Sequence, residues 1–485
     1  MDKREIAAGI VDARRDSLVA LSDRIWLFAE TGLEEVRSAA EIASALEAEG
    51  FELRRGLAGI GTAFAASFGS GAPVIALLGE YDALPGLSQA AGRPVKEELV
   101  PGGNGHGCGH NLLGAGSLGA AIAAKEYLRR SGASGTVRYY GCPGEERGSG
   151  KTFMARAGEF DGVDLALTWH PGDVNCVLQA RTLANLSAYF RFVGKSAHAA
   201  SAPHFGRSAL DAVELMNVGA NFLREHVIPE ARIHYAITNP GGRAPNVVQD
   251  LAESHYFCRA PRVSQAKEIY ERLCDVARGA ALMTGTACGI RLAEGISDYI
   301  PSKTVGELLQ RCLESVGAPA FRDSDRELAR RFRSTLSAGE LGSALSQARF
   351  TQGPRIARRL EEAPLAEDIG PLFGADALLP GSTDVGDVSQ LVPTGQAVCA
   401  CTAFGTVPHT WQFTAQAASS IGHEGMLAAA RILGLACMEA FADPGIAEKA
   451  KAELREITGG VYDCPIPEGV LPGAGAGGSP SGASR

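Results

Sequence analysis

The sequence contains one short run in which histidine and cysteine alternate with glycine, Gly105-His106-Gly107-Cys108-Gly109-His110. Thiolate and imidazole groups two residues apart can point at one ion, and both are donors suited to zinc and similar divalent metals. Glycine lets the backbone bend tightly and leaves room for an ion close to the main chain. A flexible loop with a free thiol would have the same composition, so this run alone leaves both interpretations open.

Further potential metal donors follow the strands that the hydrophobic pattern predicts. The donors are Cys108, His110, Glu145, Glu146 and His170, with His409 much later in the chain, and Asp82 lies in a loop of the same kind. In open α/β sheets, ligands bind at the carboxyl ends of the strands, so we expect these side chains to gather at one edge. Each donor also has a simpler explanation. For example, paired glutamates often begin a helix, where they favour the dipole.

The donors are too many for one metal and about enough for two. A catalytic zinc usually takes three protein ligands and leaves one position open. Two divalent ions roughly 3.5–4 Å apart can activate a water molecule and polarise a carbonyl group. One of the two adjacent glutamates, Glu145 or Glu146, would then be spare, and a spare carboxylate at this position would act as a general base.

The elements needed to position these donors are predicted by the order of strands, polar loops and helices. Residues 13–50 have helical periodicity, strand-like runs follow at 51–54, 62–68 and 74–78, and a helix is expected at 112–130. This pattern predicts an α/β fold with a mixed or parallel sheet and helices on both faces.

The pattern changes to β-α-β-β-α-β over residues 185–298, which predicts an inserted ferredoxin-like domain. The catalytic metal-binding domain would then be discontinuous, at 1–184 and 299–464. Residues 338–375 are charged, contain proline and are the least regular, so we expect a surface excursion there. Proline, glycine and serine dominate 465–485, which predicts a disordered tail.

Composition excludes several classes of partner. The 485 residues have a formal net charge of −9, which argues against a nucleic-acid-binding surface. The N-terminus has no apolar signal core, and no run reaches the roughly 20 apolar residues of a spanning helix, so no membrane partner is expected. The 11 cysteines show no disulfide framework, which is typical of a cytoplasmic protein.

Four motifs together resemble the M20 metallopeptidase family, and most closely its amidohydrolase branch with a Cys-Gly-His metal motif. The motifs are Gly107-Cys108-Gly109-His110-Asn111, Pro143-Gly144-Glu145-Glu146, Trp169-His170-Pro171 and Pro408-His409. The similarity spans almost the whole chain, apart from the tail and residues 338–375. Glu80 stands where peptidase branches have a metal-binding histidine, and Asn111 stands where many relatives have aspartate. The first of these departures favours the cysteine-containing branch, and the second alters the charge next to the metal ligands.

The resemblance implies a role for each matching residue. Five residues would hold two divalent ions, Mn²⁺ or Zn²⁺: Cys108, His110, Glu146, His170 and His409. Glu145 would be the general base. In the inserted domain, His198 lies in a motif similar to the family's lid motif and would reach the reacting carbonyl group. Asn246 and Arg259 would bind the oxyanion and a substrate carboxylate, although a turn residue and an ordinary strand-end cation would explain them nearly as well.

The resemblance also implies an activity. We expect an enzyme that cleaves the amide bond between an acyl or aroyl group and an amino acid, with conjugates similar to p-aminobenzoyl-glutamate favoured. It would form a homodimer through the inserted lid domain, and the need for a related second subunit stays open. The alternatives are a dipeptidase or N-acyl-amino-acid hydrolase of the same family, a non-catalytic partner subunit, and a protein with one structural zinc.

Overall fold

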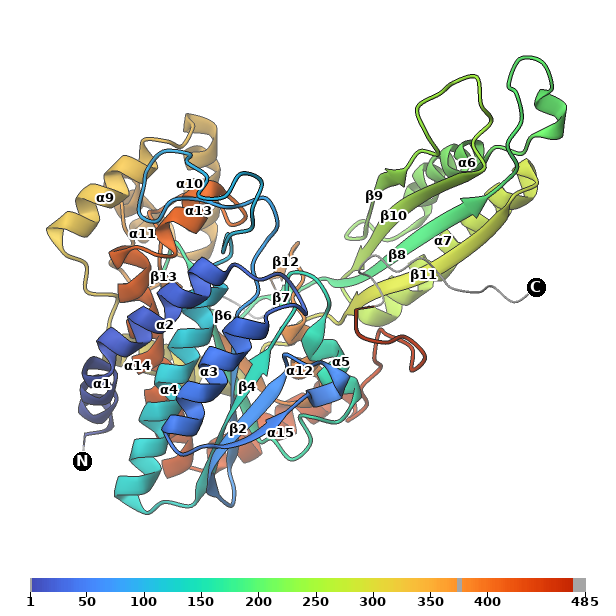
Figure 1. The fold of residues 1–485 in the computed structure, drawn as a ribbon. Helices are drawn as coiled ribbons and strands as arrows, with labels where there is room; N and C mark the ends of the chain where they lie inside the picture. Colours follow the sequence, from blue (N-terminus) through green and yellow to red (C-terminus); the bar gives the residue numbers. More distant parts are fainter. Residues whose placement is uncertain (1, 373–376, 474–485) are drawn as a thin grey trace. The chain divides into compact units, whose positions relative to one another are not determined.

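The computed structural model describes residues 2–372 and 377–473, and the chain folds into two compact units. The first unit contains residues 1–180, 300–377 and 388–462, and the second contains residues 181–299, 378–387 and 463–485 (Figure 1). The expected division into a catalytic domain and a lid domain is a functional assignment and stays a prediction.

The first unit is built on a mixed sheet of seven described strands in the order β1-β2-β4-β3-β5-β13-β6. The strands are β1 (Glu52–Arg55), β2 (Phe64–Ser70), β3 (Val74–Glu80), β4 (Gly135–Cys142), β5 (Leu165–Gly172), β6 (Cys176–Leu178) and β13 (Thr394–Ala400). Strands β4, β3, β5 and β13 are parallel to their neighbours in this series, whereas β1, β2 and β6 pair antiparallel. The expected α/β class with a mixed sheet is confirmed.

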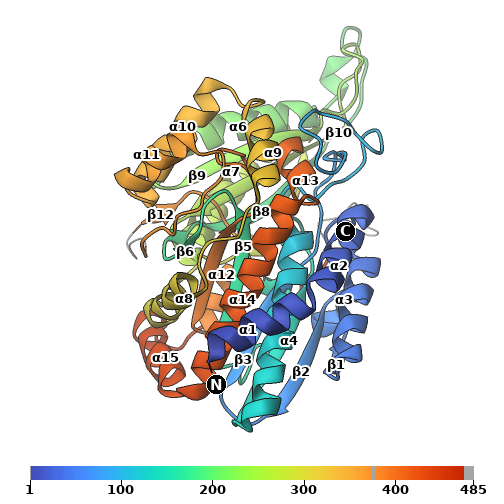
Figure 2. The ribbon, with the colours of Figure 1, turned by 90° about the vertical axis from the view of Figure 1, so that its left-hand side faces the viewer.

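Helices α3 (Val36–Ala48), α4 (His110–Ser131), α8 (Lys303–Val316) and α14 (Ser420–Ala442) pack against the strands of this sheet. The unit also contains α1 (Lys3–Ala13), α2 (Arg15–Phe28), α5 (Gly150–Arg156), α9 (Asp323–Arg333), α13 (Trp411–Gln416) and α15 (Gly445–Thr458). A further helix, α12 (Val385–Leu391), runs across the sequence boundary between the units. Helices α4 and α14 pack side by side against the sheet (Figure 2). Six consecutive residues of β3 are buried, so both faces of the sheet are covered at its centre.

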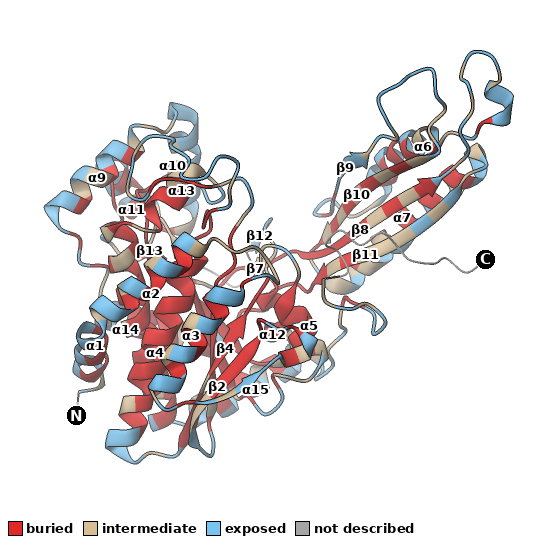
Figure 3. Ribbon diagram, in the orientation of Figure 1, coloured by how far each residue is buried: buried red, intermediate tan, exposed pale blue. Residues whose placement is uncertain are grey.

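Helix α14 corrects one expectation from the sequence, because it is long and apolar enough to cross a membrane by length and composition. Of its most apolar 18-residue window, 83% is buried inside the fold (Figure 3). Helix α14 contacts α1, α4 and α8, and most of its residues are buried. Because the helix is enclosed by other elements, its surface can be apolar on all sides.

The region 338–375 is more regular than the sequence suggested. It forms α10 (Ala338–Thr351) and α11 (Pro354–Glu362), while residues 373–376 lie outside the described part. Ser337 and Glu340 form a capping box at the start of α10. The buried faces of the two helices join a small core with Phe321 and Phe332.

The second unit is a four-stranded antiparallel sheet in the order β11-β8-β10-β9 with two long helices. Its elements are β8 (Ala184–Val193), α6 (Ala209–Leu223), β9 (Arg232–Asn239), β10 (Leu251–Ala260), α7 (Val263–Thr284) and β11 (Ala287–Ile296), with the short strands β7 (Arg181–Thr182) and β12 (Leu378–Leu379). This is the expected β-α-β-β-α-β order. Of the expected tail, Ile466 is buried at 2% exposure, and residues 474–485 lie outside the described part.

Candidate metal centre

The Cys/His run lies in the loop that leads into α4, and tight backbone contacts fix it there. Gly109 is the N-cap of α4 with φ +76°, and a Cβ at this position would lie 3.1 Å from the Pro171 side chain. Only glycine fits these two conditions without strain. The backbone N–H of His409 donates to the carbonyl oxygen of Gly107 at 2.8 Å, so the late Pro408-His409 segment is tied to this loop.

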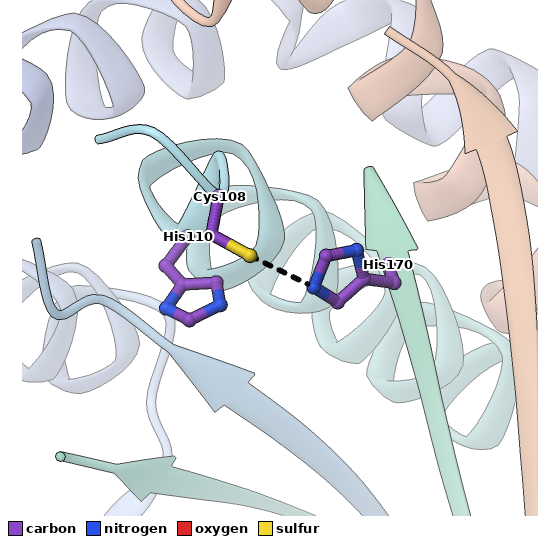
Figure 4. A group of neighbouring side chains, drawn as sticks. All are labelled: Cys108, His110 and His170. Atoms are coloured by element: carbon purple, nitrogen blue, oxygen red, sulfur yellow. Dashed lines mark hydrogen bonds between the residues drawn. The ribbon is translucent and has the colours of Figure 1, made fainter. Parts of the chain in front are cut away.

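Cys108, His110 and His170 form the first group of donors (Figure 4). Cys108 Sγ lies 3.4 Å from His170 Nε2. His110 Nδ1 is 2.8 Å from Asp82 Oδ1, and His170 Nδ1 is 2.8 Å from the carbonyl oxygen of Pro171. The hydrogen bond at Nδ1 therefore fixes the orientation of each ring, and Nε2 points into the site, where it could bind a metal ion. Metal-binding histidines are usually oriented in this way.

Cys108, Glu146 and His409 form a second group. His409 Nε2 lies 3.2 Å from Glu146 Oε1, and the Glu146 backbone N–H donates to Asp82 Oδ2 at 2.8 Å. His409 has φ 62°, a conformation that is uncommon outside glycine and is often found at functional sites. In each group the donor atoms lie within 4.8 Å of one another, and Cys108 belongs to both.

A third group contains Glu80, His110 and Glu145. Glu80 Oε1 forms an ion pair of 2.7 Å with Lys151 Nζ, and both side chains are almost fully buried. Burial by itself would raise the pKa of Glu80, but the charges of Lys151 and His110 outweigh it and lower that pKa. Lys151 was missed in the sequence, because a single lysine at the start of a short helix gives no signal of burial.

Burial and neighbouring charges also set the protonation of the donors. Burial raises the pKa of Cys108, and the carboxylate of Glu146 raises it further. Burial and His110 lower the pKa of His170, whereas a hydrogen bond with Glu146 raises that of His409. Metal ligands of these types bind in their deprotonated forms, so divalent cations would reverse the shifts of Cys108 and His409.

The residues present fit a pair of divalent ions. His110 Nε2 is fully buried, has no well-oriented hydrogen-bond partner among the described residues, and lies 3.3 Å from Glu80 Oε2. A buried ring nitrogen of this kind is costly unless a ligand satisfies it. Sulfur, imidazole and carboxylate donors in two groups that share Cys108 provide the ligand chemistry of a two-metal site.

The other predicted site residues belong to the second unit. His198 Nδ1 accepts hydrogen bonds from the backbone N–H groups of Ala200 and Ser201, at 3.2 Å and 3.1 Å. The Ala199 backbone N–H donates to the carbonyl oxygen of Asn246 at 3.0 Å, so the segments that contain His198 and Asn246 are neighbours. Arg259 lies on β10.

Arg259 donates to Ser382 Oγ at 2.9 Å, which adds the loop at Gly381–Asp384 to the surroundings of this cation. In the sequence, residues 381–387 (Gly-Ser-Thr-Asp-Val-Gly-Asp) form only a run rich in glycine and aspartate. The contact itself joins residues that are far apart in the chain, so no local pattern could have revealed it.

The chain is similar to known proteins along almost its whole length. A family model described as "Peptidase family M20/M25/M40" matches residues 76–288. The B subunit of p-aminobenzoyl-glutamate hydrolase from Escherichia coli K12 is 47% identical over 95% of this chain and 97% of its own length. The chain belongs to peptidase family M20/M25/M40. As a member of this family it is a hydrolytic enzyme that acts on amide bonds, which confirms the class of activity expected from the sequence.

Two further family relatives bear on the fold and the activity. The Xaa-Arg dipeptidase of Mus musculus is 28% identical over 93% of this chain and 91% of its own length. A solved Bacillus subtilis structure, described as a dinuclear metal-binding peptidase from the M20 family, is 17% identical with a TM-score of 0.55. It covers 89% of this chain and 99% of its own chain, and at this identity it supports the fold alone. Family membership implies divalent metal ions in this chain.

Proposed function

We propose that this M20 enzyme hydrolyses the amide bond between an acyl or aroyl group and an amino acid, with p-aminobenzoyl-glutamate-like conjugates favoured. The observation that carries the proposal is the pair of donor groups that share Cys108, with the carboxylate of Glu145 next to them. The substrate class is supported by the Escherichia coli p-aminobenzoyl-glutamate hydrolase relative, which matches 95% of the chain.

In this proposal Cys108, His110, Glu146, His170 and His409 hold two ions, which supply an activated water molecule and a polarised carbonyl group when bound. The ions are Mn²⁺ or Zn²⁺, because thiolate and imidazole favour zinc while carboxylates also suit manganese.

Glu145 is the base of the reaction. It takes a proton from the attacking water and returns it to the nitrogen of the leaving amine as the amide bond breaks. Its grouping with His110 and Glu80, and not with Cys108 and His409, supports a proton-transfer role rather than a ligand role.

The second unit would supply substrate contacts. His198 would donate to the developing oxyanion, with Asn246 beside it, and Arg259 would pair with the carboxylate of the amino-acid product. Ser382, which already accepts a hydrogen bond from Arg259, would fix the direction of the guanidinium. We assign this unit the roles of lid and homodimer contact.

Two further assignments complete the proposal. The need for a second, related subunit is supported by the Escherichia coli relative, which is itself one lettered subunit of a hydrolase. A cytoplasmic location is supported by the cysteines, because all eleven lie in the described residues and none of them forms a disulfide there.

The experiment that tests the proposal measures hydrolysis of N-acyl and N-aroyl amino acids and of dipeptides by protein reconstituted with Mn²⁺ or Zn²⁺. Cleavage of aroyl-glutamate conjugates over dipeptides supports it. A preference for dipeptides ending in arginine would instead favour a dipeptidase, which the Xaa-Arg dipeptidase relative makes the second candidate. One tightly held ion and no hydrolysis would indicate a structural zinc, and two ions with no hydrolysis a non-catalytic subunit.

A further inference from the structure

Glu35 is a buried carboxylate that the reaction described above does not use. Its side chain is fully buried just before α3, and its two carboxylate oxygens accept hydrogen bonds from separate segments. Oε1 accepts from the backbone N–H groups of Leu33 at 2.9 Å and Gly144 at 2.8 Å. Oε2 accepts from the hydroxyl of Thr62 at 3.1 Å. The residue therefore joins the segment before α3 to the turn that contains Glu145.

The turn with the proposed base is held by a buried carboxylate on each side. Gly144, immediately before Glu145, donates its N–H to Glu35. Glu146, immediately after Glu145, donates its N–H to Asp82 Oδ2 at 2.8 Å. Asp82 also orients His110, so its removal would disturb the metal ligands. The hydrogen bonds of the Glu35 carboxylate go to Leu33, Thr62 and Gly144, none of which is a proposed ligand, so Glu35 can be changed without removing a donor.

Close packing adds to this connection. Gly144 has φ +69°, and a Cβ there would lie 2.9 Å from the Leu33 side chain. A Cβ on Gly148 would also lie 2.9 Å from Leu33, and one on Gly32 would lie 2.0 Å from the carbonyl oxygen of Arg147. The segment 32–35 and the turn at 144–148 therefore fit together with no room for extra atoms, and movement of one moves the other.

We infer that Glu35 is a positioning residue for Glu145, an inference that rests on the proposed function. It fixes the Gly144 backbone, and through it the place of the Glu145 carboxylate next to the ions. A base near a reacting water is effective only within a narrow range of position, and an error of about 1 Å can cost about 10²-fold in rate. The role depends on the geometry of an acceptor oxygen and does not need a negative charge.

The surroundings of Glu35 agree with a neutral acceptor. Burial, with the charge of Asp82 acting in the same direction, raises the pKa of Glu35 to about 8. Glutamine has the same length and can accept both backbone N–H groups with its carbonyl oxygen, while its NH₂ group donates to the Thr62 oxygen. Aspartate keeps the carboxyl group but is one methylene shorter, so it cannot reach the same donors.

The experiment compares Glu35→Gln with Glu35→Asp in full-length, metal-reconstituted protein. We expect Glu35→Gln to keep kcat within about threefold of the wild type. We expect Glu35→Asp to lose about 10²-fold in kcat, with KM and the content of two metals nearly unchanged. Glu30→Gln is the matched control, because the Glu30 carboxylate accepts bonds from Arg37 and Ser38 and not from the turn. It should change stability and leave kcat unchanged.

A second readout does not need turnover. Hydrogen exchange of the peptide that contains residues 143–149 should be faster in Glu35→Asp than in the wild type, and unchanged in Glu35→Gln and Glu30→Gln. If the wild type hydrolyses no amide, the proposed function fails while this exchange still tests whether Glu35 holds the turn. The inference is overturned if Glu35→Asp exchanges and turns over like the wild type, if it loses metal, or if Glu35→Gln is as impaired as Glu35→Asp.

Discussion

The buried ion pair between Lys151 and Glu80 allows a prediction about stability whose size follows from the structure. The two side chains are 0% and 3% exposed, and Nζ lies 2.7 Å from Oε1. Lys151→Met keeps the length and apolar stem of lysine but removes the charge. The variant would leave the buried Glu80 carboxylate without its lysine partner, and His110, whose Nε2 lies 3.3 Å from Glu80 Oε2, would compensate its charge only in part.

Removal of one partner from a buried ion pair typically costs about 3–5 kcal/mol, because the remaining charge is uncompensated. The first unit contains about 330 residues, and at about 2.1 cal/mol/K per residue its unfolding entropy is about 0.7 kcal/mol/K. The expected decrease in Tm is therefore about 4–7 °C. Glu80→Gln in the Lys151→Met background removes the stranded charge and should recover most of this loss, since a neutral pair of similar shape costs little.

The assay is calorimetry of the wild type, both single variants and the double variant at pH 7 with a chelator present. Without the chelator the decrease should be smaller, because divalent cations near Glu80 would compensate its charge. A Lys151→Met protein that melts within about 1 °C of the wild type would refute the argument. So would a double variant whose Tm loss equals the sum of the two single losses, because the residues would then not be coupled.

Three further predictions concern the site itself. Cys108→Ser should bind less metal and lose activity while its circular dichroism is unchanged, because Cys108 lies in a loop; full metal content by elemental analysis would contradict its role as a ligand. Glu145→Gln should lose about 10²–10⁴-fold in kcat yet retain two metals, whereas Glu146→Gln should lose metal; the opposite pattern would mean that the two roles are exchanged. His198→Ala should lower kcat far more than metal content, and a monomer in solution with full activity would exclude a histidine supplied by a second copy.

Much of the fold could be predicted because its patterns are local. The buried β3 is a continuous apolar run, the helices before it have a 3.6-residue period, and the second unit keeps its β-α-β-β-α-β order. The errors also have local causes. Helix α14 was not recognised as a long apolar segment, because glycines and a few polar residues interrupt its sequence. The capping box formed by Ser337 and Glu340 at the start of α10 was also not recognised.

The sequence by itself determined the chemistry of the candidate centre. Sulfur, imidazole and carboxylate donors at the ends of strands bind only a small class of divalent metal ions. This chemical preference does not depend on where the strands lie in the fold. The residue types around Cys108 and His110, and the paired Glu145 and Glu146, are therefore enough to predict a metal site, whereas amide hydrolysis was predicted only through the resemblance to the M20 family. They do not indicate which donors share an ion.

Only the tertiary structure decided how the donors are grouped and what supports them. The grouping of Cys108 with Glu146 and His409, the Lys151 partner of Glu80, and the contact between Glu35 and Gly144 all join residues from different elements. Such contacts depend on strand order, strand register and packing, whereas hydrophobic periodicity reports only which face of an element is buried. The partner that each buried charge meets is fixed when the elements come together, because only then is water excluded and the charge must be compensated.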